Sequence, residues 1–446
     1  MQNHEHVVII GNGISGITAA RHLRKNSDCQ ITVISGETDY FYSRTALMYI
    51  YMGHMEFEHT QPYENWFWKK NKIDLVKAWV TNIDPQNKVL KLEGKEDISY
   101  NSLILATGSV SNKFGWPGQD AKGVSGLYNA QDLQYIENHT KDVTRAVIIG
   151  GGLIGIELAE MLHSRQIDVT FLVREKNFWD IVLPEGEAKM INQEILDHHI
   201  DLRLETELKE IVTNANGEVA AVITNNGEKI ECQFVGLTVG VSPNVKWLKE
   251  TGLEINRGIL VNQYLETNLP GVYAIGDCAE HKSPSPGRRP VEQVWYTGRM
   301  MGEVVAQTIA GQRNTYKPGI WFNSAKFFNI EYQTYGWVKP QLDEGHLQFY
   351  WQADDGKKSL RVVFDEQTLA VIGVNVLGIR MRHEVWNEWI SSELKVNQIM
   401  ERLEEANFDP EFFKKYEYSI RESFNNEFDS MAIRNQRPSF IKRLFA

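Results

Sequence analysis

Residues 6–23 read HVVIIGNGISGITAARHL, and this stretch decides the fold. Residues 6–10 form an almost continuous apolar run, which is typical of a strand buried on both faces of a sheet. Apolar residues at helical spacing follow over residues 17–23, and a second apolar run occupies residues 30–34. The sequence therefore predicts a strand–helix–strand unit of about 30 residues.

Three glycines, Gly11, Gly13 and Gly16, lie between the first strand and the helix. In this spacing the first glycine permits a tight turn, the second lets the backbone approach a pyrophosphate, and the third lets the helix pack close to the strand. The phosphates would lie at the helix N-terminus, where unpaired N–H groups and the helix dipole favour an anion. Glu37 follows the second strand and is expected to accept the ribose hydroxyls, the alternative being a solvated loop charge.

The same pattern returns at residues 145–162, which read RAVIIGGGLIGIELAEML and contain Gly150, Gly152 and Gly155. A single glycine motif is weak evidence, because glycine-rich turns also occur for structural reasons alone. Two such motifs, each between a strand and a helix, predict two dinucleotide sites. A flavin that is held permanently and a nicotinamide that delivers a hydride are the chemically sensible pair.

The composition is that of a folded protein with two or three domains, since the 446 residues are 42% hydrophobic and 24% charged. The net charge of −11 argues against a nucleic-acid partner. No apolar run is long enough to span a bilayer, and the N-terminal residues resemble no secretory signal. The three cysteines form no CxxC pair, so we expect no metal site and a reducing compartment such as the cytoplasm.

Three further stretches make the pattern specific: LILATGS at residues 103–109, TVGVSPN at 238–244 and VYAIGDCA at 272–279. With them the chain resembles the flavoproteins with two dinucleotide-binding domains, also called the pyridine nucleotide–disulfide oxidoreductase superfamily. The resemblance implies an α/β protein with two Rossmann-like domains, which bind FAD and NAD(P), and a C-terminal α+β domain. The implied boundaries are 1–115 with 235–315 for the FAD domain, 116–234 for the NAD(P) domain and 316–446 for the C-terminal domain.

The resemblance also assigns roles to single residues. Asp277, after Gly276, would contact the ribityl chain of FAD. The segment Ala106-Thr107-Gly108 would be a hinge and a loop close to FAD. Glu157 matches an acidic residue near the nicotinamide, and its alternative role is an acid in the first turn of a helix, where the dipole favours it.

One departure from the family matters most. Members that use thiols carry one or two redox cysteines soon after the first unit, whereas residues 40–49 here read YFYSRTALMY. Without a thiolate near the flavin, disulfide reductase chemistry is disfavoured. The Tyr-Ser-Arg44 segment instead resembles that of rubredoxin, ferredoxin and nitrite reductase flavoproteins, in which a basic residue lies beside the isoalloxazine ring. Arg44 would stabilise the anionic reduced flavin, the alternative being a surface ion pair.

The nicotinamide preference stays open between two interpretations of residues 174–176, which read Arg-Glu-Lys. Arg174 with Lys176 would bind a 2′-phosphate through charge-assisted hydrogen bonds, which favours NADPH. Glu175 would instead accept from the ribose hydroxyls, as in proteins that use NADH.

The last third of the chain carries weaker signals. We expect a helix that opens at Val291 and runs to about Ala310, a strand over 320–336, and a small sheet with helices beyond it. We interpret the aromatic residues of the predicted strand as part of the hydrophobic core, the alternative being that they cover the flavin ring. The histidine at the start of a later helix has no redox cysteine with which it could act as an acid or base. These residues are Trp321, Phe322, Phe327 and His383. The basic amphipathic tail, residues 434–446, would contact a membrane surface or dock on the protein itself.

The sequence therefore predicts an FAD-dependent NAD(P)H oxidoreductase that delivers electrons to a small carrier of the rubredoxin, ferredoxin or nitrite reductase type. A quinone is the alternative acceptor, supported by the tail alone. A flavin-bearing NADH sensor or scaffold that resembles apoptosis-inducing factor is the non-enzymatic alternative. A homodimer is compatible with each of these hypotheses.

Overall fold

The computed structural model describes residues 5–408 and 414–433 of the chain. The chain divides into two compact units. The first unit comprises residues 1–150, 157–169 and 208–318, and the second comprises residues 151–156, 170–207 and 319–446. The three domain boundaries expected from the sequence remain a prediction.

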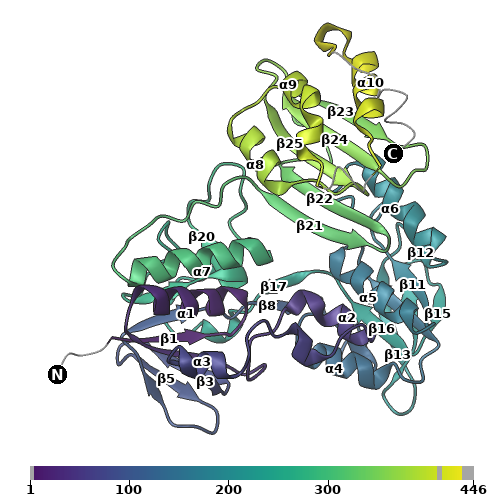
Figure 1. Cartoon of the computed structure of the whole chain (residues 1–446). Helices are drawn as coiled ribbons and strands as arrows, with labels where there is room; N and C mark the ends of the chain where they lie inside the picture. Colours follow the sequence, from purple (N-terminus) through teal and green to yellow (C-terminus); the bar gives the residue numbers. More distant parts are fainter. Residues whose placement is uncertain (1–4, 409–413, 434–446) are drawn as a thin grey trace. The chain divides into compact units, whose positions relative to one another are not determined.

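The first unit is built on a five-stranded parallel sheet with the strand order β19-β7-β1-β2-β3. Its strands are β1 (His6–Ile10), β2 (Gln30–Ser35), β3 (Ile73–Lys77), β7 (Ser102–Leu105) and β19 (Val272–Ala274). Val7, Val8 and Ile9 are fully buried, which confirms the strand expected from the apolar run. The helices α1 (Ile14–Asn26) and α7 (Trp295–Ile309) lie side by side (Figure 1). The end of α7 agrees with the prediction, but its expected start at Val291 was wrong, because the backbone is still extended at Val294.

The turn between β1 and α1 depends on close backbone contacts. Gly11 has φ +111°, and a Cβ atom placed on it would lie 2.1 Å from the carbonyl oxygen of Ala106. A Cβ on Gly16 would lie 2.0 Å from the carbonyl oxygen of Gly11, so α1 can pack this close to the turn only with a glycine there. A Cβ on Gly13 would meet no atom within 4 Å. The three glycines therefore have the three different environments that the motif predicts.

Smaller elements complete the first unit. One three-stranded antiparallel sheet follows β3, and a second is formed within residues 208–231. Two short strand pairs flank the motifs, and three parallel strands, one of which precedes the second glycine motif, lie side by side. These elements are α2 (Leu47–Tyr51), α3 (Trp66–Lys70), β4 (Val80–Asp84), β5 (Val89–Leu92), β6 (Ile98–Ser99), β8 (Ser109–Ser111), β9 (Val124–Ser125), α4 (Ala130–His139), β10 (Arg145–Ile149), β13 (Leu208–Thr213), β14 (Val219–Thr224), β15 (Lys229–Glu231), β16 (Phe234–Leu237), β17 (Val241–Pro243), β18 (Ile259–Val261) and β20 (Ala279–His281).

The second glycine motif also lies between a strand and a helix. It follows β10 and precedes α5 (Leu153–Ser164), as predicted. Gly150 has φ +110°, and a Cβ on it would lie 2.8 Å from the carbonyl oxygen of Thr238. A Cβ on Gly152 would meet no atom within 4 Å. The two motifs thus repeat the same local geometry.

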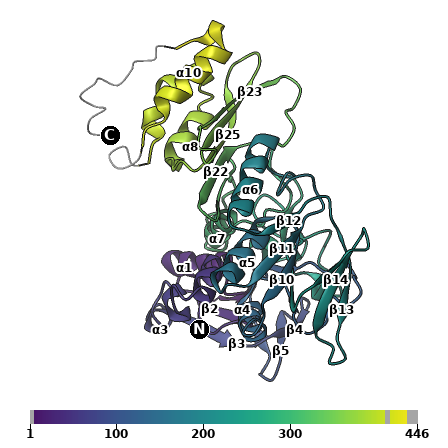
Figure 2. The same cartoon turned by 90° about the vertical axis from the view of Figure 1, so that its right-hand side faces the viewer.

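The second unit contains a five-stranded antiparallel sheet with the order β21-β22-β25-β24-β23. Helices α8 and α10 cover one face of this sheet (Figure 2), and Trp386, Trp389 and Phe424 are buried in the core there. The elements of this unit are β11 (Asp168–Leu172), α6 (Glu185–Asp197), β12 (Asp201–Arg203), β21 (Phe322–Phe327), β22 (Ile330–Gly336), β23 (His346–Gln352), β24 (Ser359–Asp365), β25 (Val371–Leu377), α8 (His383–Ser391), α9 (Val396–Glu401) and α10 (Glu417–Glu427).

The single strand expected over residues 320–336 was wrong, because this stretch forms the hairpin of β21 and β22. The chain reverses at Phe328, which has φ +50°. A bulky residue rarely adopts this left-handed conformation, so the sequence carries no turn signal at this position.

Helices with the length and apolar character of a membrane span are not found in residues 5–408 and 414–433. The basic tail, residues 434–446, lies outside the described residues.

The glycine environments predict unequal effects of alanine at two neighbouring positions. Gly16→Ala should destabilise the protein by about 1–3 kcal/mol, because its Cβ would collide with the backbone of Gly11. Gly13→Ala should cost less than about 1 kcal/mol, because its Cβ enters open space. Urea unfolding of the flavin-free protein measures both, and equal losses would contradict the packing role of Gly16.

Candidate functional site

Four segments of the first unit meet at one edge of the parallel sheet. The turn at Gly11, the segment with Glu37, the stretch Ala106–Gly108 and the pair Gly276-Asp277 each follow the carboxyl end of a strand. Parallel strands present these ends at a common edge, which is where α/β sheets bind ligands. Close approaches confirm the assembly, since a Cβ on Gly276 would lie 2.6 Å from Ser15 Oγ and one on Gly11 would contact Ala106.

Glu37 and Arg44, which the sequence analysis treated separately, form an ion pair. Arg44 donates from its two terminal nitrogens to the two oxygens of Glu37, over 3.0 and 2.7 Å. The Tyr42 hydroxyl and the Ala130 N–H also donate to Glu37 Oε1. Burial alone would raise the pKa of Glu37, but the Arg44 guanidinium outweighs it and holds this pKa below its ordinary value. Glu37 therefore stays ionised near neutral pH.

Asp277 is held by hydrogen bonds from Ser109, the last residue of the LILATGS stretch, and from Tyr128, which lies in no motif. Ser109 Oγ and the Tyr128 hydroxyl donate to Asp277 Oδ2 over 3.0 and 3.2 Å. Gln293 Nε2 donates in turn to Ser109 Oγ over 2.7 Å. Burial raises the pKa of Asp277 above its ordinary value, although both hydrogen bonds lower it. The hydrogen bonds orient the carboxylate at the sheet edge.

Tyr128 connects the two acidic residues of this edge. Its carbonyl oxygen accepts a hydrogen bond of 2.6 Å from Arg44, and its ring lies 4.6 Å from the Arg44 guanidinium carbon. Its hydroxyl accepts from the Ser109 N–H and donates to Asp277. Sequence reasoning missed Tyr128, because it lies just before the N-cap of α4 and far from every motif. Ser109 could have been found, since it directly follows the predicted loop.

The predicted loop Ala106–Gly108 is tied to the returning chain. Thr107 Oγ1 donates to the carbonyl oxygen of Asn244 over 3.0 Å, and the Asn244 N–H donates to the Gly108 carbonyl oxygen over 2.9 Å. Asn244 ends the TVGVSPN stretch. The two sequence motifs therefore form one structural element.

Glu157 lies in α5 and has a strongly perturbed carboxyl group. Burial raises its pKa to about 7, and the like charge of Glu160 adds to the shift. A carboxyl with a pKa near neutrality is able to hold or release a proton under physiological conditions.

Arg174 and Glu175 are paired with each other in the second unit. The Arg174 Nε and a terminal nitrogen both donate to Glu175 Oε1, over 3.1 and 2.8 Å. The Arg174 side chain is 69% exposed. Because the two candidate determinants of the nucleotide preference share one ion pair, the pairing favours neither NADH nor NADPH.

The aromatic candidates of the second unit pack against other aromatic rings. Phe327 is fully buried and contacts Trp179, with ring centroids 5.5 Å apart. Trp321 stacks on Trp337 at 5.3 Å, and the Phe322 ring lies 4.0 Å from that of His383. These contacts agree with the core interpretation of the aromatic residues.

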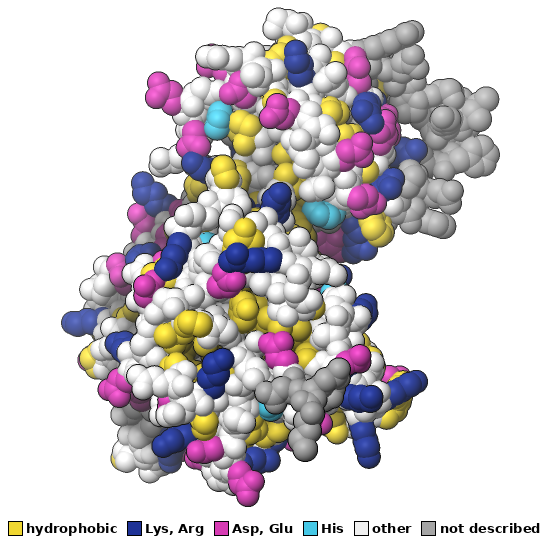
Figure 3. All heavy atoms as spheres, turned by 90° about the vertical axis from the view of Figure 1, so that its left-hand side faces the viewer, with side chains coloured by type: hydrophobic (Ala, Val, Ile, Leu, Met, Phe, Trp, Pro, Cys, Tyr) yellow, Lys and Arg dark blue, Asp and Glu magenta, His cyan; other side chains and the backbone are white. Residues whose placement is uncertain are grey.

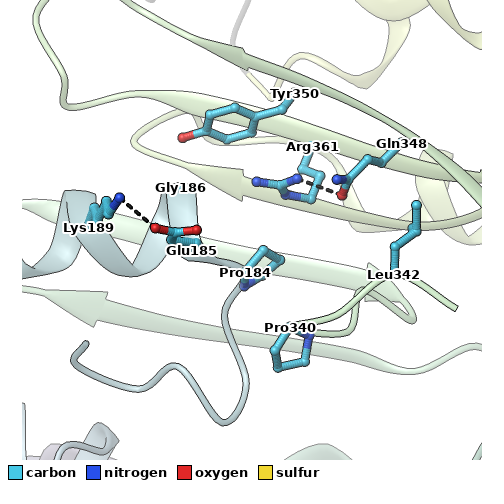
Figure 4. A pocket seen from close by; sticks show the side chains of 9 residues that line it. All are labelled: Pro184, Glu185, Gly186, Lys189, Pro340, Leu342, Gln348, Tyr350 and Arg361. Carbon is cyan, nitrogen blue, oxygen red and sulfur yellow. Dashed lines mark hydrogen bonds and ion pairs between the residues drawn. The ribbon is translucent and has the colours of Figure 1, made fainter. Parts of the chain in front are cut away.

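A hollow of about 440 Å³ opens in the second unit between α6 and strands β23 and β24 (Figure 4). Its charged side chains are already paired: Lys189 with Glu185 at 2.6 Å, and Arg361 with the buried Glu187 at 2.7 Å. Because these charges are already paired, we assign no ligand to the hollow. Its lining residues are Pro184, Glu185, Gly186, Lys189, Pro340, Leu342, Gln348, Tyr350 and Arg361.

Charges of both signs are interspersed over the face that Figure 3 shows. Within the part of the chain that the structure describes, no group of three or more His, Cys, Asp or Glu side chains is arranged to hold a metal ion.

Comparison with known proteins identifies the family. The model of the pyridine nucleotide-disulphide oxidoreductases matches residues 5–304, so the chain belongs to this family. The chain is 31% identical to the NADH-rubredoxin oxidoreductase of Clostridium acetobutylicum, over 70% of this chain and 76% of that protein. The solved structure of an NAD-dependent persulfide reductase from A. fulgidus has the same fold, with a TM-score of 0.82 at 22% identity over 95% of this chain and 84% of that one.

The chain is also 30% identical to the nitrite reductase (NAD(P)H) of Bacillus subtilis, over 63% of this chain. The match spans 35% of that relative, so the chain covers about a third of its length.

The raised pKa of Glu157 predicts a pH-dependent stability. Above pH ~4.5 the unfolded chain loses this proton, whereas the folded protein keeps it up to about pH 7, so the free energy of unfolding falls as the pH rises. Glu157→Gln should therefore stabilise the protein by up to about 3 kcal/mol at pH 8.5, and much less at pH 5. Urea unfolding at the two pH values measures the difference, and a gain that is equal at both would refute the shifted pKa.

Proposed function

We propose that this protein is an FAD-dependent NAD(P)H oxidoreductase that passes electrons to a small electron-carrier protein. The observation that carries the proposal is the repeated turn geometry. In each motif the first glycine, Gly11 or Gly150, has a positive φ and lies against a carbonyl oxygen, and the middle glycine, Gly13 or Gly152, faces open space. An opening of this kind before a helix is what a pyrophosphate requires.

The residues of the first unit fit FAD. No side chain caps the N-terminus of α1 and its first turn has no acidic residue, so its first N–H groups are free to bind phosphate. Glu37 Oε1 accepts three hydrogen bonds, whereas Oε2 accepts one, from Arg44. Oε2 therefore has a lone pair left for a ribose hydroxyl. Asp277, oriented by Ser109 and Tyr128, would accept from the ribityl chain.

The ion pair changes the role that we propose for Arg44. The sequence placed Glu37 at the adenosine end of FAD and Arg44 at the isoalloxazine end. A salt bridge of 2.7–3.0 Å holds both groups at one end of the cofactor. We propose that Arg44 positions Glu37 for the ribose, because its pairing keeps the carboxylate ionised and fixed.

For the nicotinamide nucleotide we propose Gly150, Gly152 and Gly155 at the pyrophosphate and Arg174 with Glu175 at the adenosine ribose. Glu157 would lie near the nicotinamide, where its pKa of about 7 lets it hold a proton. Bound FAD supplies the conversion between a two-electron hydride donor and a one-electron acceptor.

Two observations support a protein carrier as the acceptor. Residues 40–49 contain no cysteine, so the protein lacks the thiolate that would pass electrons to a thiol or disulfide acceptor. A relative that is 31% identical is an NADH-rubredoxin oxidoreductase. The quinone alternative depends on residues 434–446, which lie outside the described residues. We place the protein in the cytoplasm, since the free thiols of Cys29, Cys232 and Cys278 suit a reducing compartment.

Two glutamate substitutions test the site assignment. Gly13→Glu should give a folded but colourless protein, because a carboxylate would occupy the place of the FAD pyrophosphate. Gly152→Glu should stay yellow, but its flavin should be reduced by NAD(P)H at least about 100-fold more slowly at a fixed nucleotide concentration. Absorption spectra and anaerobic stopped-flow measurements give both results.

The alanine variants at the same positions are matched comparisons, because each adds a Cβ that meets no protein atom and carries no charge, so each should weaken nucleotide binding less than glutamate does. A yellow Gly13→Glu protein that is reduced at the wild-type rate would overturn the assignment.

A further inference from the structure

Helices α2, α4 and α5 end around one buried tyrosine of the first unit. Tyr51 is the last residue of α2 and is 1% exposed. Its hydroxyl lies 2.7 Å from the hydroxyl of Thr140, the residue at the C-cap of α4. Thr140 donates its own hydrogen to the Ile136 carbonyl oxygen, so Tyr51 is the donor of the bond between the two hydroxyls. Arg165, which follows α5, donates from two nitrogens to the Tyr51 carbonyl oxygen.

The Arg165 guanidinium also covers the face of the tyrosine ring. Its carbon lies 3.5 Å from the centroid of the Tyr51 ring, and a terminal nitrogen lies 3.5 Å from a carboxylate oxygen of Glu137 on α4. An aromatic face and a carboxylate both attract a cation, as do the free carbonyl oxygens at helix C-termini. The single side chain of Arg165 therefore joins α5 to both α2 and α4.

The closing turn of α5 fixes the backbone of Arg165. The Gln166 N–H donates to the His163 carbonyl oxygen over 2.9 Å, and the Ile167 N–H donates to the Leu162 carbonyl oxygen over 3.2 Å. Gln166 has φ +61°. Two such hydrogen bonds around a left-handed residue form the Schellman motif, which ends many helices. The anchor point of the Arg165 side chain is therefore rigidly connected to α5.

The opposite ends of the three helices begin beside residues that we assign to the two nucleotides. Arg44 begins the turn that leads into α2. Ala130, the first residue of α4, donates its N–H to Glu37. Helix α5 follows Gly152. The three helices therefore run from the two proposed nucleotide sites to the same point at Tyr51.

We propose that Arg165 and Tyr51 are positioning residues, which hold the helix of the nicotinamide motif against the two helices of the flavin site. Neither side chain is assigned a contact with a cofactor. The inference rests on the proposed function, since it assumes that Gly152 binds the nicotinamide nucleotide and that Glu37 binds FAD.

The step that depends on this position is the transfer of one hydride, with its electron pair, from the reduced nicotinamide to the oxidised flavin. Its products are an oxidised nicotinamide and an anionic reduced flavin. A misplacement of about 1 Å between reacting groups slows an enzymatic step by about 100-fold. Loss of Arg165 should therefore slow the transfer, while the groups that bind the nucleotide stay in place.

The test separates nucleotide binding from hydride transfer. Full-length protein with its bound FAD is mixed anaerobically with increasing NADH and, in parallel, NADPH, and the flavin band is recorded by stopped flow. Arg165→Ala should lower the limiting rate constant of reduction by about 10- to 100-fold and leave the Kd of the nucleotide within about threefold of the wild-type value. A merely structural role would reduce the amount of folded protein, whereas the limiting rate constant per bound flavin would not change.

Two milder substitutions show which contacts matter. Arg165→Lys keeps the positive charge but has one nitrogen in place of the guanidinium fork, so it should recover part of the limiting rate constant. Tyr51→Phe keeps the ring and removes only the hydroxyl that binds Thr140, so it should slow the reduction less than Arg165→Ala does.

Arg313 offers a matched control in the first unit, because it also pairs with a glutamate and covers a tyrosine ring. It lies 2.8 Å from Glu266, and its guanidinium carbon lies 4.0 Å from the centroid of the Tyr264 ring. Arg313→Ala should leave both the limiting rate constant and the Kd at their wild-type values.

Two outcomes would overturn the positioning role: a wild-type limiting rate constant in Arg165→Ala, or a loss of nucleotide affinity that accounts for the whole effect. If Arg165→Ala does not fold, wild-type limiting rate constants in both Arg165→Lys and Tyr51→Phe would overturn it. A wild-type protein whose flavin neither nucleotide reduces would refute the proposed function itself, so the two failures are distinguishable.

Discussion

The contact between Gly11 and the Ala106 carbonyl oxygen is the constraint on which the rest of the site depends. A turn this tight lets β1, β7 and α1 meet without a side chain between them, and it directs the free N–H groups of α1 toward the sheet edge. The segments with Glu37 and Asp277 reach the same edge because their strands are parallel to β1 and β7. A larger residue at position 11 would separate these elements, and the four segments would no longer form one site.

The site is held together by charged and polar side chains that pair with one another. Arg44 neutralises Glu37, and the Tyr128 carbonyl and hydroxyl groups connect that pair to the carboxylate of Asp277. A preformed network lowers the cost of ordering side chains when a cofactor binds. In this account the network orients the groups that FAD would contact.

Much of the fold could be predicted from the sequence, because β1 and β10 are apolar runs followed by glycines with a defined spacing. The Glu37–Arg44 pair could not, since residues seven positions apart in a loop have no periodic relation. Tyr128 was missed for a similar reason: it reaches Asp277, 149 positions away, only through the folded chain. The hairpin at Phe328 escaped prediction because its turn uses a residue that rarely adopts a positive φ.

The central claim is that one chain holds a flavin and reduces it with a nicotinamide nucleotide. The most direct test is an anaerobic titration of the purified full-length protein with NADH and, in parallel, with NADPH, while the visible flavin band is recorded. The account predicts a yellow protein whose flavin is bleached within seconds by at least one of the two nucleotides. A protein without flavin, or a flavin that neither nucleotide reduces, would contradict it.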